Sequence, residues 1–312
     1  MKKYDIICIG TALVDSIITG FDPTPVSASG YLAKSQSLKA GGEAVNVSIA
    51  LAKLGLKTGI VCSLGADPAG DMIAASLKEN GVDTDLLIRS GDHPTPVTTM
   101  FVKDDGSRKS IVNEAHRYNF HPEQNKRSFT DARALILGSL FRAPFDDAAI
   151  IREVLKSAGA AGQVVFADTK LPNYRILELG DVKDSLEFID YITPNEDEAR
   201  YFTGRDDPEE MAEVFLDQGV RNVIIKLGAG GCLLKNAEGS LRLSAYKVDA
   251  IDSTGAGDNF IAGFASELLH GASAHEALKF ANACGAICTT AVGAQTALKN
   301  RDQVLEFMAC NV

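Results

Sequence analysis

The stretch DSTGAGDNF, residues 252–260, combines the residue types that phosphate chemistry needs. Gly255-Ala256-Gly257 predicts a tight turn into an amphipathic helix, whose first amides attract anions because they lack intrahelical partners and lie at the positive end of the helix dipole. Asp258 adds a carboxylate at this anion site. It can complement the helix start, or it can take a proton from a hydroxyl while the amides stabilise a phosphoryl group. The local pattern leaves both interpretations open.

The rest of the chain supplies the elements that must position this turn. Short, continuously apolar runs alternate with amphipathic stretches. The strand-like runs are DIICIG, TGIVCSLG, ALILGSL, QVVFADT, FIDYITPN and NVIIKLG, and the helix-like stretches cover residues 44–55, 69–81, 146–159 and 207–219. This rhythm predicts an α/β fold with a doubly wound, mainly parallel sheet that has helices on both faces.

Two segments interrupt the rhythm. Residues 11 to about 40 have no helical period, and residues 96–113 resemble two strands around an Asp105-Gly106 turn. We expect a small β-sheet from about 11–40 and 96–117 that covers a pocket as a lid, with an ordinary surface hairpin as the alternative. Because exposed sheet edges tend to pair, we expect a homodimer through the lids.

The composition narrows the range of partners. The chain has 312 residues, 46% of them hydrophobic, and a formal net charge of −10, which argues against nucleic acid and anionic membranes. No apolar run approaches the length of a membrane span. Six scattered cysteines form no CxxC pair, and the five histidines show no metal-ligand spacing. These features predict a cytoplasmic protein with reduced cysteines and a small-molecule substrate.

Two long motifs carry a family resemblance. DSTGAGDNFIAGF and AGGEAVNVSIALAKLG, the latter at 40–55, resemble the two signatures of the ribokinase-like sugar kinases, the PfkB carbohydrate kinase family. They occur in the family's order and spacing, and weaker matches extend from DIICIG to VGAQTA. The resemblance implies one kinase domain over residues 1–312, with a β lid, that phosphorylates a sugar with ATP and Mg²⁺, and K⁺ as a further activator.

The resemblance also implies roles for individual residues. Asp258 matches the catalytic base, and the turn Gly255, Ala256 and Gly257 matches the anion hole. The positions that match substrate contacts are Asp15, Gly41, Gly42, Asn46 and Asp258. The positions that match ATP contacts are Asn195, Lys226, Gly228, Gly231, Gly257 and Asn282.

The implied metal sites use two further groups. Glu198 completes the N-x-x-E element that organises Mg²⁺ through water. The loops implied to hold K⁺ contain Asp252, Thr254, Ala291 and Gly293. Two positions depart from the family pattern. Lys226 replaces a small hydroxyl residue, and Ala297 replaces a serine that ribokinase tends to have.

The identity of the sugar that accepts the phosphoryl group stays open at this point. GSLF, residues 138–141, lacks the glutamate that ribokinase commonly has there, so we expect fructose, ribose or a related sugar, with a keto-deoxy acid also open. Arg142 and Lys170 fit either the pocket or the surface. The alternatives are a nucleoside kinase and a non-catalytic sugar-binding protein on the same fold. A Rossmann dehydrogenase is disfavoured because GTALVDS lacks GxGxxG.

Overall fold

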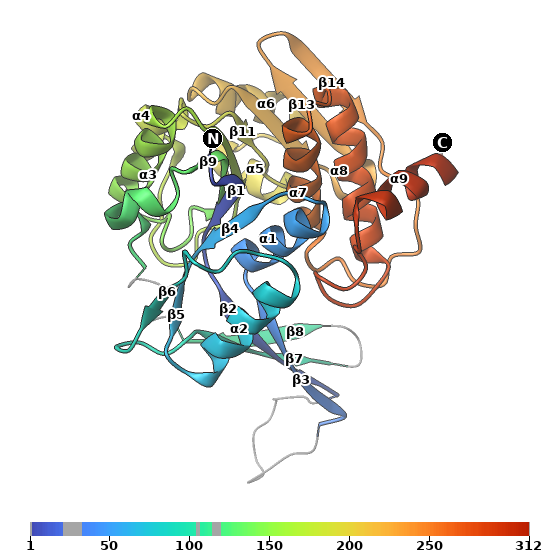
Figure 1. Ribbon diagram of the computed structural model, residues 1–312. Helices are drawn as coiled ribbons and strands as arrows, with labels where there is room; N and C mark the ends of the chain where they lie inside the picture. Colours follow the sequence, from blue (N-terminus) through green and yellow to red (C-terminus); the bar gives the residue numbers. More distant parts are fainter. Residues whose placement is uncertain (1, 21–32, 104–106, 114–119, 312) are drawn as a thin grey trace.

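The computed structural model describes residues 2–20, 33–103, 107–113 and 120–311. Within these residues the main sheet has the strand order β14-β13-β12-β11-β10-β9-β1-β4 (Figure 1). In chain order its strands are β1 (Tyr4–Ile9), β4 (Thr58–Val61), β9 (Ala132–Leu140), β10 (Val164–Thr169), β11 (Tyr191–Ile192), β12 (Asn222–Lys226), β13 (Cys232–Asn236) and β14 (Gly239–Leu243). The strands from β4 to β12 are parallel, and β13 and β14 form an antiparallel edge. The predicted doubly wound, mainly parallel sheet is confirmed.

Helices cover both faces of this sheet because its strands are apolar on both sides. Ile6 and Cys8 of β1 belong to the core beneath one helical layer, whereas Ile7 and Ile9 belong to the core beneath the other. The first layer contains α1 (Glu43–Lys53), α2 (Pro68–Glu79), α7 (Ala256–Leu269), α8 (Ala274–Thr289) and α9 (Arg301–Cys310). The second contains α3 (Ala148–Ala160), α4 (Lys183–Leu186), α5 (Glu196–Thr203) and α6 (Pro208–Asp217). Two-sided burial therefore explains the continuously apolar strand sequences.

Aspartate caps define where three of the predicted helices begin. Asp67, Asp147 and Asp207 each accept hydrogen bonds from backbone amides in the first turn of α2, α3 and α6, respectively. These bonds satisfy amides that have no partner within the helix. The observed starts lie within two residues of the predicted ones.

A separate small sheet projects from the body below α1 in Figure 1, beside α2. It contains β2 (Leu13–Thr19), β3 (Ser35–Gly41), β7 (Val97–Val102) and β8 (Arg108–Val112) in the order β3-β2-β7-β8, and a short pair β5 (Ser63–Gly65) and β6 (Ile88–Ser90) forms a third sheet. The two segments that break the helical rhythm thus come together in one sheet. Residues 21–32, the Asp105-Gly106 turn and residues 114–117 of the predicted lid lie outside the described residues.

The helices of the described ranges are all too short or too polar to cross a membrane.

The edges of the small sheet motivate a prediction about assembly. β3 and β8 are its outer strands, and Leu38 and Ile111 on them expose 56% and 66% of their surface. Because unpaired edges and exposed apolar side chains favour association, we expect two copies to pair through these sheets. Light scattering should give a dimer mass that falls toward the monomer in the Leu38→Lys, Ile111→Lys double variant. A monomer mass at every concentration of the unmodified chain would contradict this prediction.

Candidate active site

Asp258 is held by a second helix rather than by its own helix start. Its buried carboxylate accepts a hydrogen bond through Oδ2 from Asn46 Nδ2 on α1, at 2.7 Å. Asn46 Oδ1 in turn accepts one from Gln295 Nε2, at 2.8 Å. Burial raises the pKa of Asp258, and the charge of Lys170 and the Asn46 hydrogen bond oppose that rise. A carboxylate with a raised pKa is suited to accept a proton near neutral pH.

The glycine turn brings the start of α7 against the loop that follows α8. Gly255 precedes the helix with φ of 78°, and a Cβ at this position would overlap Ala294. Ala256 N donates to Ser253 O at 3.2 Å, so one of the two predicted anion-hole amides already has a turn partner. The amide of Gly257 lies in the first helical turn, where backbone donors have no intrahelical acceptor. Gly257 is therefore the stronger candidate for anion binding.

Asp168, at the end of β10, was missed by the motif analysis. Its Oδ1 accepts hydrogen bonds from Lys226 Nζ at 2.6 Å and from Thr193 Oγ1 at 2.7 Å. Its Oδ2 is buried without a hydrogen-bond partner in the described part of the chain. The Lys226 ammonium also lies 3.1 Å from the place that a Cβ on Gly257 would occupy. Lys226 therefore brings positive charge to the predicted anion site.

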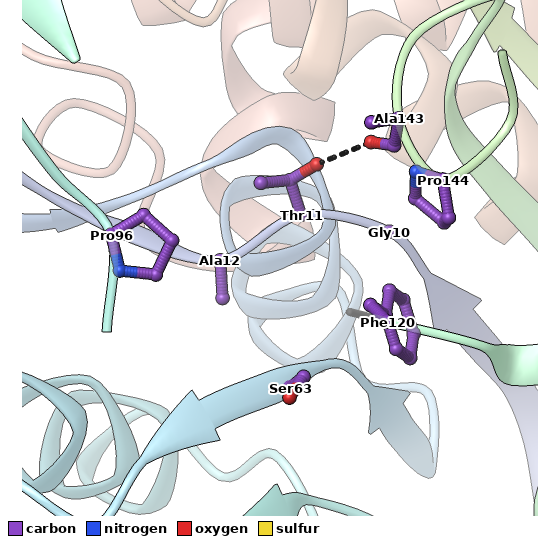
Figure 2. A pocket seen from close by; sticks show the side chains of 8 residues that line it. All are labelled: Gly10, Thr11, Ala12, Ser63, Pro96, Phe120, Ala143 and Pro144. Atoms are coloured by element: carbon purple, nitrogen blue, oxygen red, sulfur yellow. Dashed lines mark hydrogen bonds between the residues drawn. The ribbon is translucent and has the colours of Figure 1, made fainter. Parts of the chain in front are cut away.

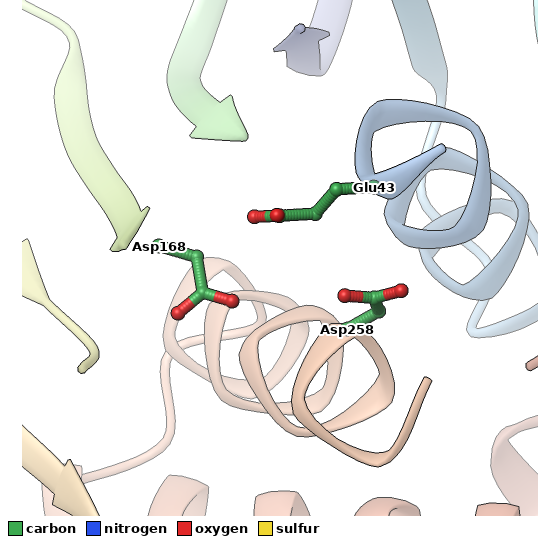
Figure 3. A group of neighbouring side chains, drawn as sticks. All are labelled: Glu43, Asp168 and Asp258. Atoms are coloured by element: carbon green, nitrogen blue, oxygen red, sulfur yellow. The ribbon is translucent and has the colours of Figure 1, made fainter. Parts of the chain in front are cut away.

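Glu43 was also missed, and it completes a cluster of three buried carboxylates. Oxygens of Glu43, Asp168 and Asp258 lie within 4.8 Å of one another, close enough to share a cation, and the three side chains converge in Figure 3. Glu43 accepts hydrogen bonds from Ser139 N at 2.9 Å and Ser139 Oγ at 2.5 Å. Its Oε2 is 3.7 Å from Lys170 Nζ. Burial, followed by the charge of Asp168, raises the pKa of Glu43 to about 8, whereas Lys170 opposes the rise.

The predicted substrate residues meet where β3 turns into α1. A Cβ on Gly41 would overlap Asp15 Oδ2, and a Cβ on Gly42, whose φ is 95°, would overlap Thr11 O. These glycines therefore allow the turn to pass directly over Asp15 and the end of β1. The predicted substrate positions therefore lie in a row that ends at Asp258. They are Asp15, Gly41, Gly42 and Asn46.

A small cavity lies beside these predicted substrate positions (Figure 2). It lies between the main sheet and the start of β7, and Thr11 Oγ1 donates to Ala143 O at 3.2 Å at its rim. Its lining residues are Gly10, Thr11, Ala12, Ser63, Pro96, Phe120, Ala143 and Pro144. Its lining includes neither Asp258 nor the glycine turn, so it lies apart from the predicted reaction site.

Asn195 and Glu198 form a reciprocal cap at the start of α5. Asn195 Oδ1 accepts from Glu198 N at 2.8 Å, and Glu198 Oε2 accepts from Asn195 N at 3.0 Å. Glu198 Oε2 also accepts a hydrogen bond from Thr169 Oγ1, at 2.8 Å. Thr169 directly follows Asp168 on β10, so this buried carboxylate lies at the end of that strand. Burial is the main cause that raises the pKa of Glu198. The cap explains the motif locally, and the burial of the carboxylate beside Asp168 goes beyond what a cap requires.

The predicted nucleotide residues separate into two groups. Gly228 lies in an exposed turn that follows β12, whereas Gly231 at the end of this turn is buried, and a Cβ on Gly231 would overlap Leu243 O. Asn282, in contrast, is buried in α8 and its Nδ2 donates to Ser244 O at 3.3 Å. This contact ties α8 to the segment after β14, so its side chain has a structural role there.

Asp252 joins the two loops that were predicted to hold K⁺. Its Oδ1 accepts from Thr254 N at 2.9 Å and Thr254 Oγ1 at 2.7 Å, and its Oδ2 accepts from Gly293 N at 2.8 Å. Ala291 lies in the same loop as Gly293, and Ala297 offers no side-chain oxygen. This hydrogen bond joins the two loops, and the K⁺ site itself stays a prediction.

Comparisons with known proteins identify chains of similar sequence and fold. The chain is 28% identical to the probable fructokinase-7 of Arabidopsis thaliana, over 97% of this chain and 92% of that protein. A structure of Arabidopsis thaliana ribokinase complexed with ribose and ATP superimposes with a TM-score of 0.87 at 26% identity, over 98% of both chains. A putative ribokinase II from E. coli in complex with ATP and Mg²⁺ gives 0.80 at 25% identity, over 98% of this chain and 99% of that one.

The family model for pfkB family carbohydrate kinases matches residues 3–301, which is nearly the whole chain. This match contains both signature motifs and the buried Asp258 at the glycine turn. The chain therefore belongs to the pfkB family of carbohydrate kinases.

Proposed function

We propose that the protein transfers the γ-phosphoryl group of ATP to a hydroxyl of a neutral sugar, with fructose, ribose or a related sugar as the acceptor. One observation carries the proposal: the buried Asp258 carboxylate, fixed by Asn46, lies in the same first turn of α7 as the Gly257 amide, beside the Lys226 ammonium. A base and an anion site are thus adjacent, as transfer of a phosphoryl group to a hydroxyl requires.

In the proposed reaction Asp258 takes the proton of the acceptor hydroxyl. A bond forms between that oxygen and the γ-phosphorus while the bond to the bridging oxygen of ADP breaks, and ADP leaves with the electron pair. The Gly257 amide and Lys226 face the charge on the phosphoryl oxygens during this step. In this proposal residues Gly228–Gly231 serve the nucleotide, and the small sheet, which contains Asp15 and Gly41, acts as the lid on the acceptor side.

Mg²⁺ belongs to this proposal because the site contains a buried carboxylate oxygen, Asp168 Oδ2, that has no hydrogen-bond partner among the described residues, and the buried Glu198 lies nearby. When bound with ATP, Mg²⁺ neutralises charge on the phosphates. Glu198 would approach the ion through water. K⁺ is proposed at the joined loops of Asp252 and Gly293, with no step assigned to it.

The net charge of the site influences which kind of acceptor it can bind. Within the described residues of the site, the acids Glu43, Asp168, Glu198 and Asp258 outnumber the lysines Lys170 and Lys226 that oppose them. Asp15 adds a further acid where the acceptor enters. Because like charges repel strongly in a buried site, this excess of acids favours a neutral polyol over a sugar acid or a sugar phosphate.

The role of Asp258 can be separated from its place in the helix. Asp258→Asn keeps the size of the side chain and an oxygen that can accept from Asn46, but it removes the proton acceptor. We expect kcat to fall by roughly 10²- to 10⁴-fold, the range for a lost general base. The thermal midpoint should hardly change. A near-normal kcat with saturating ATP and the best acceptor would remove the base assignment.

The role of Glu198 predicts a different kinetic effect. Glu198→Gln retains the reciprocal cap with Asn195 but removes the charge, so we expect more Mg²⁺ to be needed for half-maximal rate while KM for the sugar stays near normal. Titrating the rate with Mg²⁺ at fixed ATP measures this effect, and the exposed Glu196→Gln serves as a control in the same turn. If both variants show unchanged Mg²⁺ dependence, Glu198 is only a helix cap.

A further inference from the structure

Lys170 occupies a position between the buried carboxylates and the open side of the site. It directly follows β10, and its backbone N donates to Leu140 O at 2.9 Å, which ties it to the end of β9. Its Nζ lies 3.7 Å from Glu43 Oε2. The Lys170 side chain is 35% exposed, whereas that of Glu43 is 4% exposed. The ammonium is thus anchored from the buried side and remains accessible from the other.

The anchor itself is rigid. Both oxygens of Glu43 accept hydrogen bonds from Ser139, one from its backbone N and one from its hydroxyl. Ser139 has φ of 61°, and two residues later Phe141 has φ of 73°. Such conformations are uncommon for residues other than glycine and persist where the surroundings fix them. The end of β9 therefore holds the Glu43 carboxylate, and Glu43 holds Lys170.

The two lysines of the site differ in how fully they are engaged. Lys226 makes a hydrogen-bonded ion pair with Asp168 at 2.6 Å, and its side chain is only 12% exposed. The 3.7 Å between Lys170 Nζ and Glu43 Oε2 is longer than a hydrogen bond, so this pair leaves the ammonium donors available. Lys170 therefore differs from Lys226 in that it combines an acid partner with a partly exposed ammonium.

We propose that Lys170 is a further catalytic residue of the transfer, contacting the phosphoryl group on its way to the acceptor, and that Glu43 is its positioning residue. This inference rests on the proposed kinase function. The ammonium supplies positive charge where negative charge accumulates between the leaving and attacking oxygens. Glu43, 3.7 Å away, holds the ammonium in this position from the buried side.

The competing explanation is that Lys170 only neutralises the buried Glu43. Removing one partner of a buried pair leaves a costly charge, and removing both relieves that cost. Lys170→Met, Lys170→Arg, Glu43→Gln and the Glu43→Gln, Lys170→Met double variant distinguish the two. The exposed pair Lys126 and Glu153, 2.6 Å apart, provides matched controls as Lys126→Met and Glu153→Gln, which should change nothing measurable.

We expect Lys170→Met to lower kcat by about 10²-fold, the effect of losing one donor to a developing charge, with KM for ATP and for the sugar within about threefold. Lys170→Arg should recover at least part of this loss. Glu43→Gln should lower kcat less, and the double variant should be as slow as Lys170→Met because Glu43 acts through Lys170. Recovery of both kcat and the thermal midpoint in the double variant would overturn the proposal.

A binding measurement separates this inference from the kinase function. ADP with aluminium fluoride mimics the transferring phosphoryl group and needs no acceptor, so Lys170→Met should weaken its binding by about tenfold or more while the binding of ADP alone is unchanged. If the unmodified protein phosphorylates no acceptor, the proposed function fails. If it is active and Lys170→Met equals it in kcat and in aluminium fluoride binding, only the role of Lys170 fails.

Discussion

The arrangement of this protein's site depends on how buried negative charge is compensated. Carboxylates cannot leave water without paired charges or hydrogen bonds, and each acid here obtains its partners from another element. Asp168 on β10 pairs with Lys226 on β12, Asp258 on α7 with Asn46 on α1, and Glu43 on α1 with Ser139 on β9. These contacts fix the carboxyl ends of the parallel strands relative to the first turns of α1 and α7. The same contacts leave the site with more acids than lysines, which a phosphate-bound cation can balance.

The backbone around the acids allows neighbouring segments of the chain to approach one another closely. α1, α5 and α7 all begin at the site, and the positive ends of their dipoles offset part of its negative charge. Gly42 and Gly255 precede α1 and α7 with positive φ, and at both positions a Cβ would overlap a neighbouring segment. The acid and the amides proposed to bind the anion can therefore be adjacent on α7 without competing, because the Asp258 side chain faces α1 while the amides point along the helix axis.

The sequence predicts much of this arrangement, and the part that it misses has a physical reason. Continuous apolar runs indicated the parallel sheet, and motifs of fixed spacing indicated Asp258, Asn46 and Glu198. Asp168 could have been found, because residues that follow parallel strands line the ligand-binding edge of such sheets. Glu43 resembled an ordinary helix start, and Lys170 resembled a surface cation, since only the left-handed turn at Ser139 brings them together. The nucleotide role of Asn282 stays a prediction, and its hydrogen bond to Ser244 O is a contact that no local pattern encodes.

The central claim is that phosphate passes from ATP to a neutral sugar hydroxyl, and product analysis tests it most directly. The protein is incubated with ATP, Mg²⁺ and a panel of sugars, sugar acids, sugar phosphates and nucleosides, and the products are identified by ³¹P NMR. We predict one phosphorylated sugar, with fructose or ribose as the best acceptor, and one ADP for each product formed. Bound sugar with no phosphate transfer, or a nucleoside phosphorylated in preference to every sugar, would contradict it.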